Sequence, residues 1–268
     1  MILTDTHAHL YLKEFNQNRQ KVITTAIEKN VRYILLPNID SSTIGGLLNL
    51  CDMFPENCFP MIGLHPTSVK LNFKDELKIV EQWLEKRKFY AIGEIGIDLY
   101  WDKTFAKEQE IAFRHQINLA KKNNLPIVIH SRDSFIETYK IVEDLNTTDL
   151  IGVFHCFTGS LEQANKIIDL GFMLGIGGVL TFKNSGLEKV IEKIDLKHII
   201  LETDSPYLTP VPFRGKRNES AYISYIAEKL AEIKNISIKE VAEITTKNAM
   251  DLFKINCKNN STSNFNSM

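Results

Sequence analysis

Histidine and acidic side chains stand at or just beyond the predicted ends of several β-strands in this sequence. His7 and His9 alternate with Asp5 along and beyond the first predicted strand, so a period of two directs all three side chains to the same side. The residues of metal-binding type come from five predicted strands: His7, His9, Glu94, His130, His155 and Asp204. If these strands are parallel and close into a barrel, their carboxyl ends bring four imidazoles and two carboxylates to one mouth.

Such a cluster would be costly to bury without a cation, because neutral imidazoles supply too few hydrogen-bond donors for two desolvated carboxylates. Imidazole nitrogen and carboxylate oxygen are usual ligands of divalent metal ions. Six ligands exceed the need of one tetrahedral ion and suit two ions that share a bridge. We therefore expect two divalent ions per chain, of Mg, Mn or Zn. The expected ligands are His7, His9 and Asp204 for one ion, His130 and His155 for the other, and Glu94 as the bridge.

A lone histidine at a strand end is more often a hydrogen-bonded core residue than a ligand. The interpretation as a metal site therefore depends on ligand-type residues occurring at five strand ends together. His115, in the middle of a predicted helix, and His198, at the start of the last predicted strand, serve as comparisons, and we expect both to be structural. Glu202 shares the parity of Asp204 and is expected one layer deeper, as an acid behind the ligands that could compete with Asp204.

The elements that must position these side chains alternate regularly. Eight apolar, β-branched segments are predicted strands: residues 2–8, 33–37, 59–64, 90–95, 127–130, 151–155, 172–176 and 199–203. Amphipathic helical segments cover residues 19–30, 74–88, 107–123, 134–145, 161–170 and 222–234, and Ser237 with Glu240 predicts the capping box of a last helix. Eight such units favour an α/β fold of the closed (β/α)₈ TIM-barrel type over a doubly wound sheet. We expect a single barrel domain over residues 1–255 and a polar, flexible tail over residues 256–268.

The composition excludes several classes of protein. The 268 residues are 44% hydrophobic and 24% charged, which is typical of a globular chain and not of a disordered or fibrous one. Lys and Arg number 32 against 33 Asp and Glu, so an anionic substrate needs a local site. The four cysteines form no metal-binding pair or disulfide framework, and neither a leader-like segment nor an apolar run of membrane-spanning length occurs. We expect a cytoplasmic protein with no membrane association and no obligate protein partner.

Seven short motifs occur in the order found in one enzyme family. They are DTHAHL (5–10), IGLHP (62–66), IGEIGID (92–98), PIVIHSR (126–132), HCFTG (155–159), ETDSPY (202–207) and RGKRNE (214–219). On these motifs the sequence resembles the TatD family of metal-dependent deoxyribonucleases, within the amidohydrolase-like barrel superfamily. The resemblance implies a TIM-type barrel, a two-metal site on the six residues above, and hydrolysis, typically of DNA. Some relatives have His where Phe213 stands and Pro where Ser220 stands; neither is an expected ligand, and the first lies in a loop that could contact substrate.

A polynucleotide also needs donors for its phosphates besides the metal ions. Arg214, Lys216 and Arg217 lie in the loop beyond the eighth predicted strand, and we expect them to bind substrate; a solvated basic loop is the alternative. His65, at the end of the third predicted strand, is expected to contact the scissile phosphate or a metal ligand. The aromatic residues beyond the fourth predicted strand could stack a nucleobase or cap the barrel: Tyr100, Trp101 and Phe105.

The expected function is hydrolysis of phosphodiester bonds in transiently bound DNA, from strand ends and with a preference for single strands. Glu94 and Asp204 are the expected catalytic residues: an activated water attacks phosphorus, and Asp204 accepts or relays its proton. Hydrolysis of another ester or amide on the same barrel, such as deacylation of D-aminoacyl-tRNA, is the alternative enzyme activity. A non-catalytic metal-dependent scaffold is an alternative of another class, and it would need a closed coordination shell.

Overall fold

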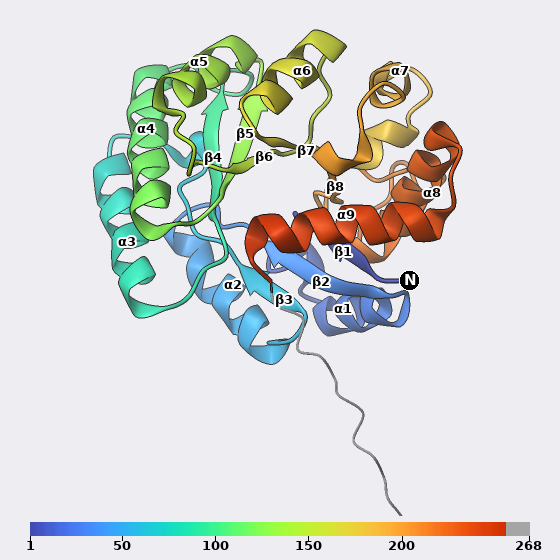
Figure 1. Cartoon of the computed structure of the whole chain (residues 1–268). Helices are drawn as coiled ribbons and strands as arrows, with labels where there is room; N and C mark the ends of the chain where they lie inside the picture. Colours follow the sequence, from blue (N-terminus) through green and yellow to red (C-terminus); the bar gives the residue numbers. More distant parts are fainter. Residues whose placement is uncertain (256–268) are drawn as a thin grey trace, which may run out of the picture.

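The structure, a computed structural model, describes residues 1–255 (Figure 1). The predicted tail, residues 256–268, lies outside the described residues. The strands are β1 (Leu3–Asp5), β2 (Val31–Leu36), β3 (Cys58–Pro60), β4 (Ile92–Asp98), β5 (Ile127–Arg132), β6 (Gly152–Phe154), β7 (Met173–Ile176) and β8 (Ile199–Leu201). The α-helices are α1 (Arg19–Glu28), α2 (Ser41–Met53), α3 (Phe73–Lys86), α4 (Ala106–Asn123), α5 (Phe135–Leu145), α6 (Leu161–Asp169), α7 (Leu187–Ile191), α8 (Ile223–Lys234) and α9 (Ile238–Phe253).

Parallel pairing joins the strands in chain order and closes them into a barrel. β1, β2 and β3 form one arc of hydrogen-bonded strands, and β4 to β8 form the other. Ile62 pairs with Ile92 between the two arcs, and Ala8 pairs with Ser205 where the chain continues beyond β1 and β8. The predicted (β/α)₈ barrel is therefore confirmed, since a doubly wound sheet would leave its outer strands unpaired. The helices surround the strands (Figure 1).

The predicted helices form within a few residues of their expected bounds. The hydroxyl of Ser237 accepts a hydrogen bond from the backbone N–H of Glu240 (3.2 Å), so α9 begins where its cap was predicted. The structure adds α2, whose capping box is formed by Asp40 and Thr43 and whose Gly45 and Gly46 weaken the helical pattern in the sequence. Within residues 1–255, none of the helices combines the length and apolar character needed to traverse a bilayer.

β4 differs from its prediction, and the difference bears on the site. It begins at Ile92 and continues to Asp98, so Glu94 lies inside the strand and does not close it as predicted. The pairing of β4 with β5 shifts register between Ile92 and Ile95, an irregularity that redirects the intervening side chain. At Gly96 the backbone has φ +146°, and a Cβ would lie 2.0 Å from the carbonyl oxygen of His130, so glycine is required there.

The barrel interior is apolar where the strands begin. Leu35 of β2, Val128 of β5 and Ile200 of β8 form a buried cluster with Leu252 and Phe253 of α9. α9 packs against β1 and β8, which covers this end of the barrel (Figure 1). Burial of each such side chain stabilises the fold by about 1.5–3 kcal/mol. A functional site can therefore lie only at the opposite end of the barrel interior, where the strands finish.

Candidate metal centre

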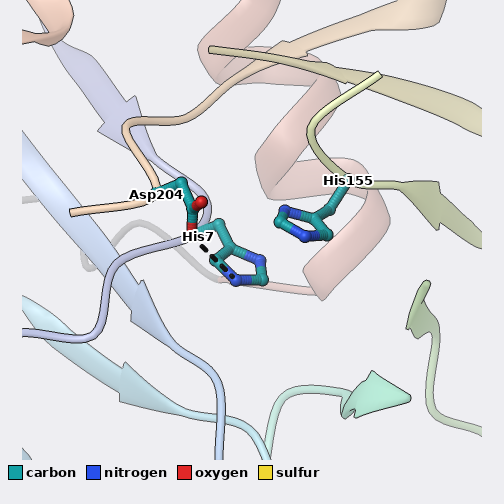
Figure 2. A group of neighbouring side chains, drawn as sticks. All are labelled: His7, His155 and Asp204. Atoms are coloured by element: carbon teal, nitrogen blue, oxygen red, sulfur yellow. Dashed lines mark ion pairs between the residues drawn. The ribbon is translucent and has the colours of Figure 1, made fainter. Parts of the chain in front are cut away.

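Three strands far apart in the sequence bring His7, His155 and Asp204 together at the open end of the barrel (Figure 2). His7 lies two residues beyond β1, His155 directly follows β6, and Asp204 lies three residues beyond β8. The rings of His7 and His155 stack, with centroids 3.9 Å apart and planes inclined by 12°. The mouth that parallel strands were expected to form is therefore present, with these ligand-type residues in it.

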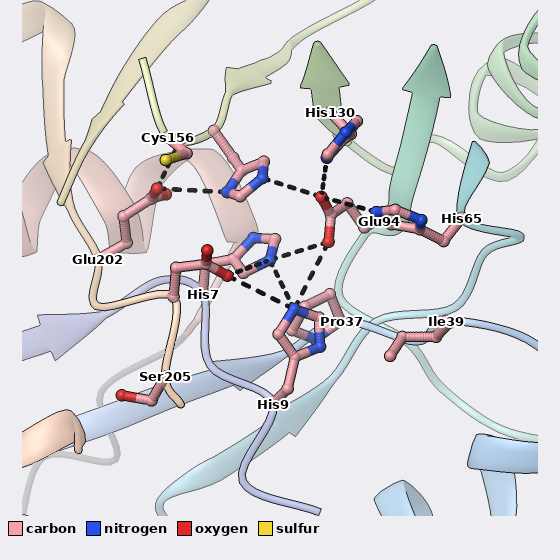
Figure 3. Close-up of polar contacts among 12 residues, drawn as sticks. His7, His9, Pro37, Ile39, His65, Glu94, His130, Cys156, Glu202 and Ser205 are labelled. Atoms are coloured by element: carbon pink, nitrogen blue, oxygen red, sulfur yellow. Dashed lines mark hydrogen bonds and ion pairs between the residues drawn. The ribbon is translucent and has the colours of Figure 1, made fainter. Parts of the chain in front are cut away.

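Glu94 lies at the centre of the cluster, and its two oxygens face different imidazoles (Figure 3). Oε1 lies 2.7 Å from Nδ1 of His130 and 2.9 Å from Nε2 of His155. Oε2 lies 3.1 Å from Nε2 of His7 and 3.6 Å from Nε2 of His9. A carboxylate with one oxygen toward each pair of nitrogens has the arrangement that a bridging ligand needs.

Asp204 completes one side of this arrangement. Its Oδ1 lies 3.8 Å from Nε2 of His7 and 3.6 Å from Nε2 of His9. The backbone at Asp204 has φ +56°, in the left-handed region, and its N–H donates to the carbonyl oxygen of His7 (2.8 Å). Its side chain is 15% exposed, against 3% for Glu94, so Asp204 is the carboxylate that faces the cavity more openly.

In His9 and His130, a neighbouring group holds the second ring nitrogen. The hydroxyl of Tyr11 donates to the carbonyl of Pro37 (2.6 Å) and therefore accepts from Nδ1 of His9 (3.0 Å). Nε2 of His130 lies 2.9 Å from Oδ2 of Asp98 and donates to it. These contacts leave Nε2 of His9 and Nδ1 of His130 with lone pairs directed at the centre, as outer groups commonly do for metal-bound histidines.

Glu202 lies behind His155, in the position predicted for an acid behind the ligands. Its Oε1 lies 3.3 Å from Nδ1 of His155 and accepts the backbone N–H of Cys156 (2.5 Å). This contact directs Nε2 of His155 at the centre. A Cβ at Gly175 would lie 2.4 Å from Oε2 of Glu202. The lack of a side chain at this one position of β7 therefore makes room for the carboxylate of Glu202.

His65 faces the same centre but is arranged differently. Its Nδ1 accepts the backbone N–H of Thr67 (3.1 Å), so in the neutral ring Nε2 carries the hydrogen. That Nε2 lies 3.4 Å from Oε1 of Glu94. His65 therefore presents a hydrogen-bond donor to the centre, which suits contact with a substrate oxygen better than ligation.

Burial and neighbouring charge shift the titration of the central groups. Burial opposes ionisation of Glu94, but the surrounding imidazoles, led by His155 and His65, hold the pKa of Glu94 well below its usual range. Burial lowers the pKa of His7, and the charge of His155 adds to this effect. Burial also disfavours charge on His155, yet Glu94 and Glu202 raise its pKa well above the usual value. The carboxylates are therefore anionic and draw positive charge to the site.

The residues present fit a divalent cation. The Nε2 atoms of His7 and His9 are 3.2 Å apart, and two ring lone pairs at this distance repel unless a proton or a cation lies between them. Within residues 1–255, Nδ1 of His7, Nδ1 of His155 and Oε2 of Glu202 are buried without hydrogen-bond partners. Over the same residues, three groups have ligand atoms close enough to share an ion: His7, His9 and Glu94; His7, His155 and Asp204; and His65, Glu94 and His130.

A cavity of about 630 Å³ opens onto this centre. Most of the expected ligands line it, together with His65. Its wall also contains Trp101, which the sequence suggested as a stacking or capping residue, and Asp98 and Arg132, to which the sequence assigned no role. Asp98 shares the parity of Glu94 within one motif, and Arg132 shares that of His130. Both could have been identified by extending the same period of two.

The basic residues predicted to bind substrate do not line this cavity. Arg217 donates to the carbonyl oxygen of Glu14 (2.6 Å), to Oδ1 of Asn18 (2.9 Å) and to Oε1 of Glu219 (2.7 Å). These bonds tie the loop beyond β8 to the turn before α1. Three hydrogen bonds thus hold the guanidinium of Arg217 within the protein, and its contact with substrate stays a prediction.

Arg214 and Lys216 are exposed on the same loop. The guanidinium of Arg214 lies over the ring of Phe182 (3.8 Å to its centroid), and Nζ of Lys216 lies 5.5 Å from the ring centroid of Phe213. Neither contacts the central imidazoles among the interactions of the described residues.

The comparison histidines lie away from the centre. His115, on α4, has its Nε2 2.7 Å from Oε1 of Glu81, and His198 lies in the short 3₁₀-helix before β8. Asp5, which shares the parity of the first two histidines, accepts from the backbone N–H (2.9 Å) and the hydroxyl (2.7 Å) of Thr203. Asp5 thus joins β1 to the chain beyond β8 and does not enter the imidazole cluster.

Comparisons with known proteins agree with this geometry. The family model described as TatD related DNase matches residues 4–254. An uncharacterised metal-dependent hydrolase of Bacillus subtilis, YabD, is 39% identical over 95% of this chain and its own whole length. The Escherichia coli counterpart YcfH is 33% identical over 95% of this chain and 97% of its own. The crystal structure of YJJV, a TatD homologue from Escherichia coli, superposes with a TM-score of 0.89 at 28% identity, covering 95% of this chain and 98% of that one.

Proposed function

This chain belongs to the family of TatD-related DNases and is a metal-dependent hydrolase, and from this premise we propose that it hydrolyses phosphodiester bonds in DNA, from single-stranded ends. The observation that carries the proposal is Glu94, whose two oxygens face two separate sets of imidazole nitrogens. Two-metal sites stabilise the entering and leaving oxygens of a displacement at phosphorus, so this arrangement suits phosphodiester cleavage.

The distances around Glu94 support the division of ligands that we propose. Nε2 of His7, Nε2 of His9 and Oδ1 of Asp204 lie around Oε2 of Glu94. The remaining ligands lie around Oε1 of Glu94 and are His130 and His155. Divalent cations held by these groups would supply a hydrolytic nucleophile at neutral pH and Lewis-acid polarisation of the scissile ester.

The chain's own residues bind the substrate and move the proton. Asp204 accepts the proton of the attacking water, because it is anionic and faces the cavity more openly than Glu94. Nε2–H of His65 donates to an oxygen of the scissile phosphate. Arg214 and Lys216 contact the outer part of a long strand. Contacts of this kind address phosphate, so cleavage has little sequence preference.

The experiment is a metal analysis of the purified protein, followed by removal of metal with a chelator and reconstitution with Mg, Mn or Zn. Each form is assayed against an end-labelled single-stranded oligonucleotide, the blunt duplex of the same sequence, and D-aminoacyl-tRNA. We expect chelation to abolish cleavage of the single strand and reconstitution to restore it, with stepwise shortening from one end. Deacylation without DNA cleavage would assign the site to the ester alternative, and no hydrolysis of either substrate would overturn both.

A further inference from the structure

Arg132 is the one Lys or Arg among the described residues that line the cavity at the metal centre. It is the last residue of β5 and lies two positions beyond His130, so a period of two places both side chains on the same face of the strand. His130 faces the centre, and Arg132 lies one layer farther out, at the rim. A positive charge one layer outside His130 on the cavity wall is placed to bind the phosphate next to the scissile one.

Two exposed aromatic rings hold the guanidinium of Arg132. Its central carbon lies 4.0 Å from the ring centroid of Tyr100 and 5.2 Å from that of Trp101. The two rings meet edge to face, with centroids 4.9 Å apart, and they are 52% and 67% exposed. Stacking uses the face of a guanidinium and leaves the N–H groups at its edge for paired hydrogen bonds to an anion. Among the described residues, no side chain or carbonyl accepts from those N–H groups.

Asp98 fixes this rim structure relative to the proposed metal ligands. Its Oδ1 accepts the backbone N–H groups of Tyr100 (3.0 Å) and Trp101 (3.0 Å), while its Oδ2 accepts from Nε2 of His130 (2.9 Å). The backbone N–H of Leu99 donates to the carbonyl oxygen of Arg132 (2.9 Å). One carboxylate thus holds the aromatic pair and a ligand together, so the rim and the centre act as one preorganised surface.

A second cavity next to the centre offers a phosphate no Lys or Arg side chain among the described residues. It has a volume of about 450 Å³, is lined by Asp133 and Glu137, and shares Ser131, His155, Cys156 and Thr158 with the first. Phosphate is repelled there and attracted to the wall of Arg132. Charge therefore selects one of the two directions in which a strand could leave the centre.

We propose that Arg132, Tyr100 and Trp101 form a nucleotide subsite for a single-stranded polynucleotide. Arg132 binds the phosphodiester next to the scissile one, and the open face of Trp101 stacks the base attached there. A base inside a duplex has both faces covered by its stacked neighbours, so the subsite favours unpaired strands. The inference rests on the proposed function and adds to it the residues that recognise the strand. It predicts faster cleavage once the substrate contains a second phosphodiester.

The first test measures binding, so that it does not depend on turnover. The chain has two tryptophans, and Trp83→Phe leaves Trp101 as the single reporter. We expect (dT)₆ to quench the fluorescence of this variant to saturation, and a blunt duplex of equal length to leave it unchanged. Arg132→Ala is expected to weaken (dT)₆ binding at least about tenfold, as is Trp101→Ala measured by anisotropy of labelled (dT)₆. Arg114→Ala, which removes an equally charged group paired with Asp144 on the surface, is the matched control and is expected to bind as wild type.

The second test separates this proposal from the proposed function. Hydrolysis of bis(p-nitrophenyl) phosphate depends on the centre more than on the rim, so Arg132→Ala and Trp101→Ala are expected to lose much less kcat/KM for it than for thymidine oligonucleotides. For thymidine oligonucleotides, the rise in kcat/KM between the dinucleotide and the trinucleotide is expected in wild type and lost in both variants. Arg132→Lys keeps the charge without the planar stack and is expected to restore less than half of the loss.

Unchanged (dT)₆ affinity in both variants, absence of quenching, or equal losses on the aryl ester and the oligonucleotides would overturn the subsite. Hydrolysis of DNA by wild type in that case would leave the proposed function intact. Binding and quenching as expected, with no hydrolysis of DNA under any metal, would support the subsite and overturn the proposed function.

Discussion

The two ends of the barrel interior are built by the same strands from opposite kinds of residue. At the end covered by α9, Val128 and Ile200 pack against Phe253, and contact alone satisfies each side chain. At the open end, the strands that carry Val128 and Ile200 continue to His130 and to the chain leading to Asp204. There the side chains are polar, and neighbouring lone pairs oppose one another. The covered end stabilises the fold, and the open end concentrates charge that only a ligand can satisfy.

β5 shows this difference within six residues. Val128, His130 and Arg132 alternate along it, so one face of one strand carries an apolar contact, a ligand-type nitrogen and a rim cation in succession. We therefore expect successive side chains on this face of β5 to serve stability, metal binding and substrate binding. Variants in each layer should affect one property and spare the others.

Glu94→Ala tests the open end with the largest expected effect. It removes the group that faces both sets of imidazoles, so we expect DNA hydrolysis to fall by about 10³-fold or more at saturating metal, with a folded circular dichroism spectrum. Glu81→Ala, on the surface of α3, is the control and should retain turnover. Activity near that of wild type in Glu94→Ala would contradict the bridging assignment.

Phe253→Ala tests the covered end. Phe253 is fully buried between α9 and the strands, so we expect the free energy of unfolding to fall by about 3–5 kcal/mol. The measurement is denaturant unfolding, with kcat determined at a temperature where the variant is folded. We expect an unchanged kcat. A lower kcat in fully folded protein would show that the two ends are coupled. It would contradict the assignment of stability to the covered end and activity to the open end.

Asp98→Asn tests the joint between the centre and the rim. The amide keeps the size of the side chain but not the charge that holds His130, so we expect metal affinity to fall by about 10–100-fold. Metal titration of the apoprotein followed by calorimetry measures this affinity. Asp144→Asn on the surface is the control, and equal metal affinity in all three proteins would exclude a role for Asp98 in orienting His130.

Arg217→Ala has the smallest expected effect. It tests a residue outside the cavity, which we expect to affect stability and not turnover. Its hydrogen bonds join the loop beyond β8 to the turn before α1, so we expect a loss of about 1–2 kcal/mol in unfolding free energy. DNA turnover should stay within twofold of wild type. A large rise in KM for DNA without a change in stability would support the prediction that Arg217 binds substrate.

The alternation of side-chain direction along each strand was enough to predict much of the candidate metal centre. The positions of His7, His9 and His155 follow from a period of two at strand ends, and the order of strands follows from eight βα units. The interior position of Glu94 could not be predicted, because the register shift in β4 depends on how that strand pairs with β5. Placing the end of β5 at His130 likewise concealed Arg132, two residues farther on.

Contacts distant in sequence account for the remaining differences. Whether an arginine is free or engaged depends on its acceptors, and those of Arg217 at Glu14 and Asn18 lie about two hundred positions earlier in the chain. Tyr11 continues the alternation of the first two histidines, but its role became clear only with the carbonyl of Pro37 beside it. Sequence patterns locate ligands, and the folded chain determines which atom of each ligand is available.

The two arcs of strands have a mechanical consequence for the loaded protein. His7 and His9 belong to the arc of β1 to β3, whereas Glu94 and Asp204 belong to the arc of β4 to β8. A cation shared by these four residues would add a cross-link to the backbone hydrogen bonds, the Asp5–Thr203 contacts and the packing of α9 that already join the two arcs. Amide hydrogen exchange where the two arcs meet should then slow on loading and accelerate on chelation, while exchange within each arc stays constant. The catalytic ion would thus also set how readily the cylinder opens.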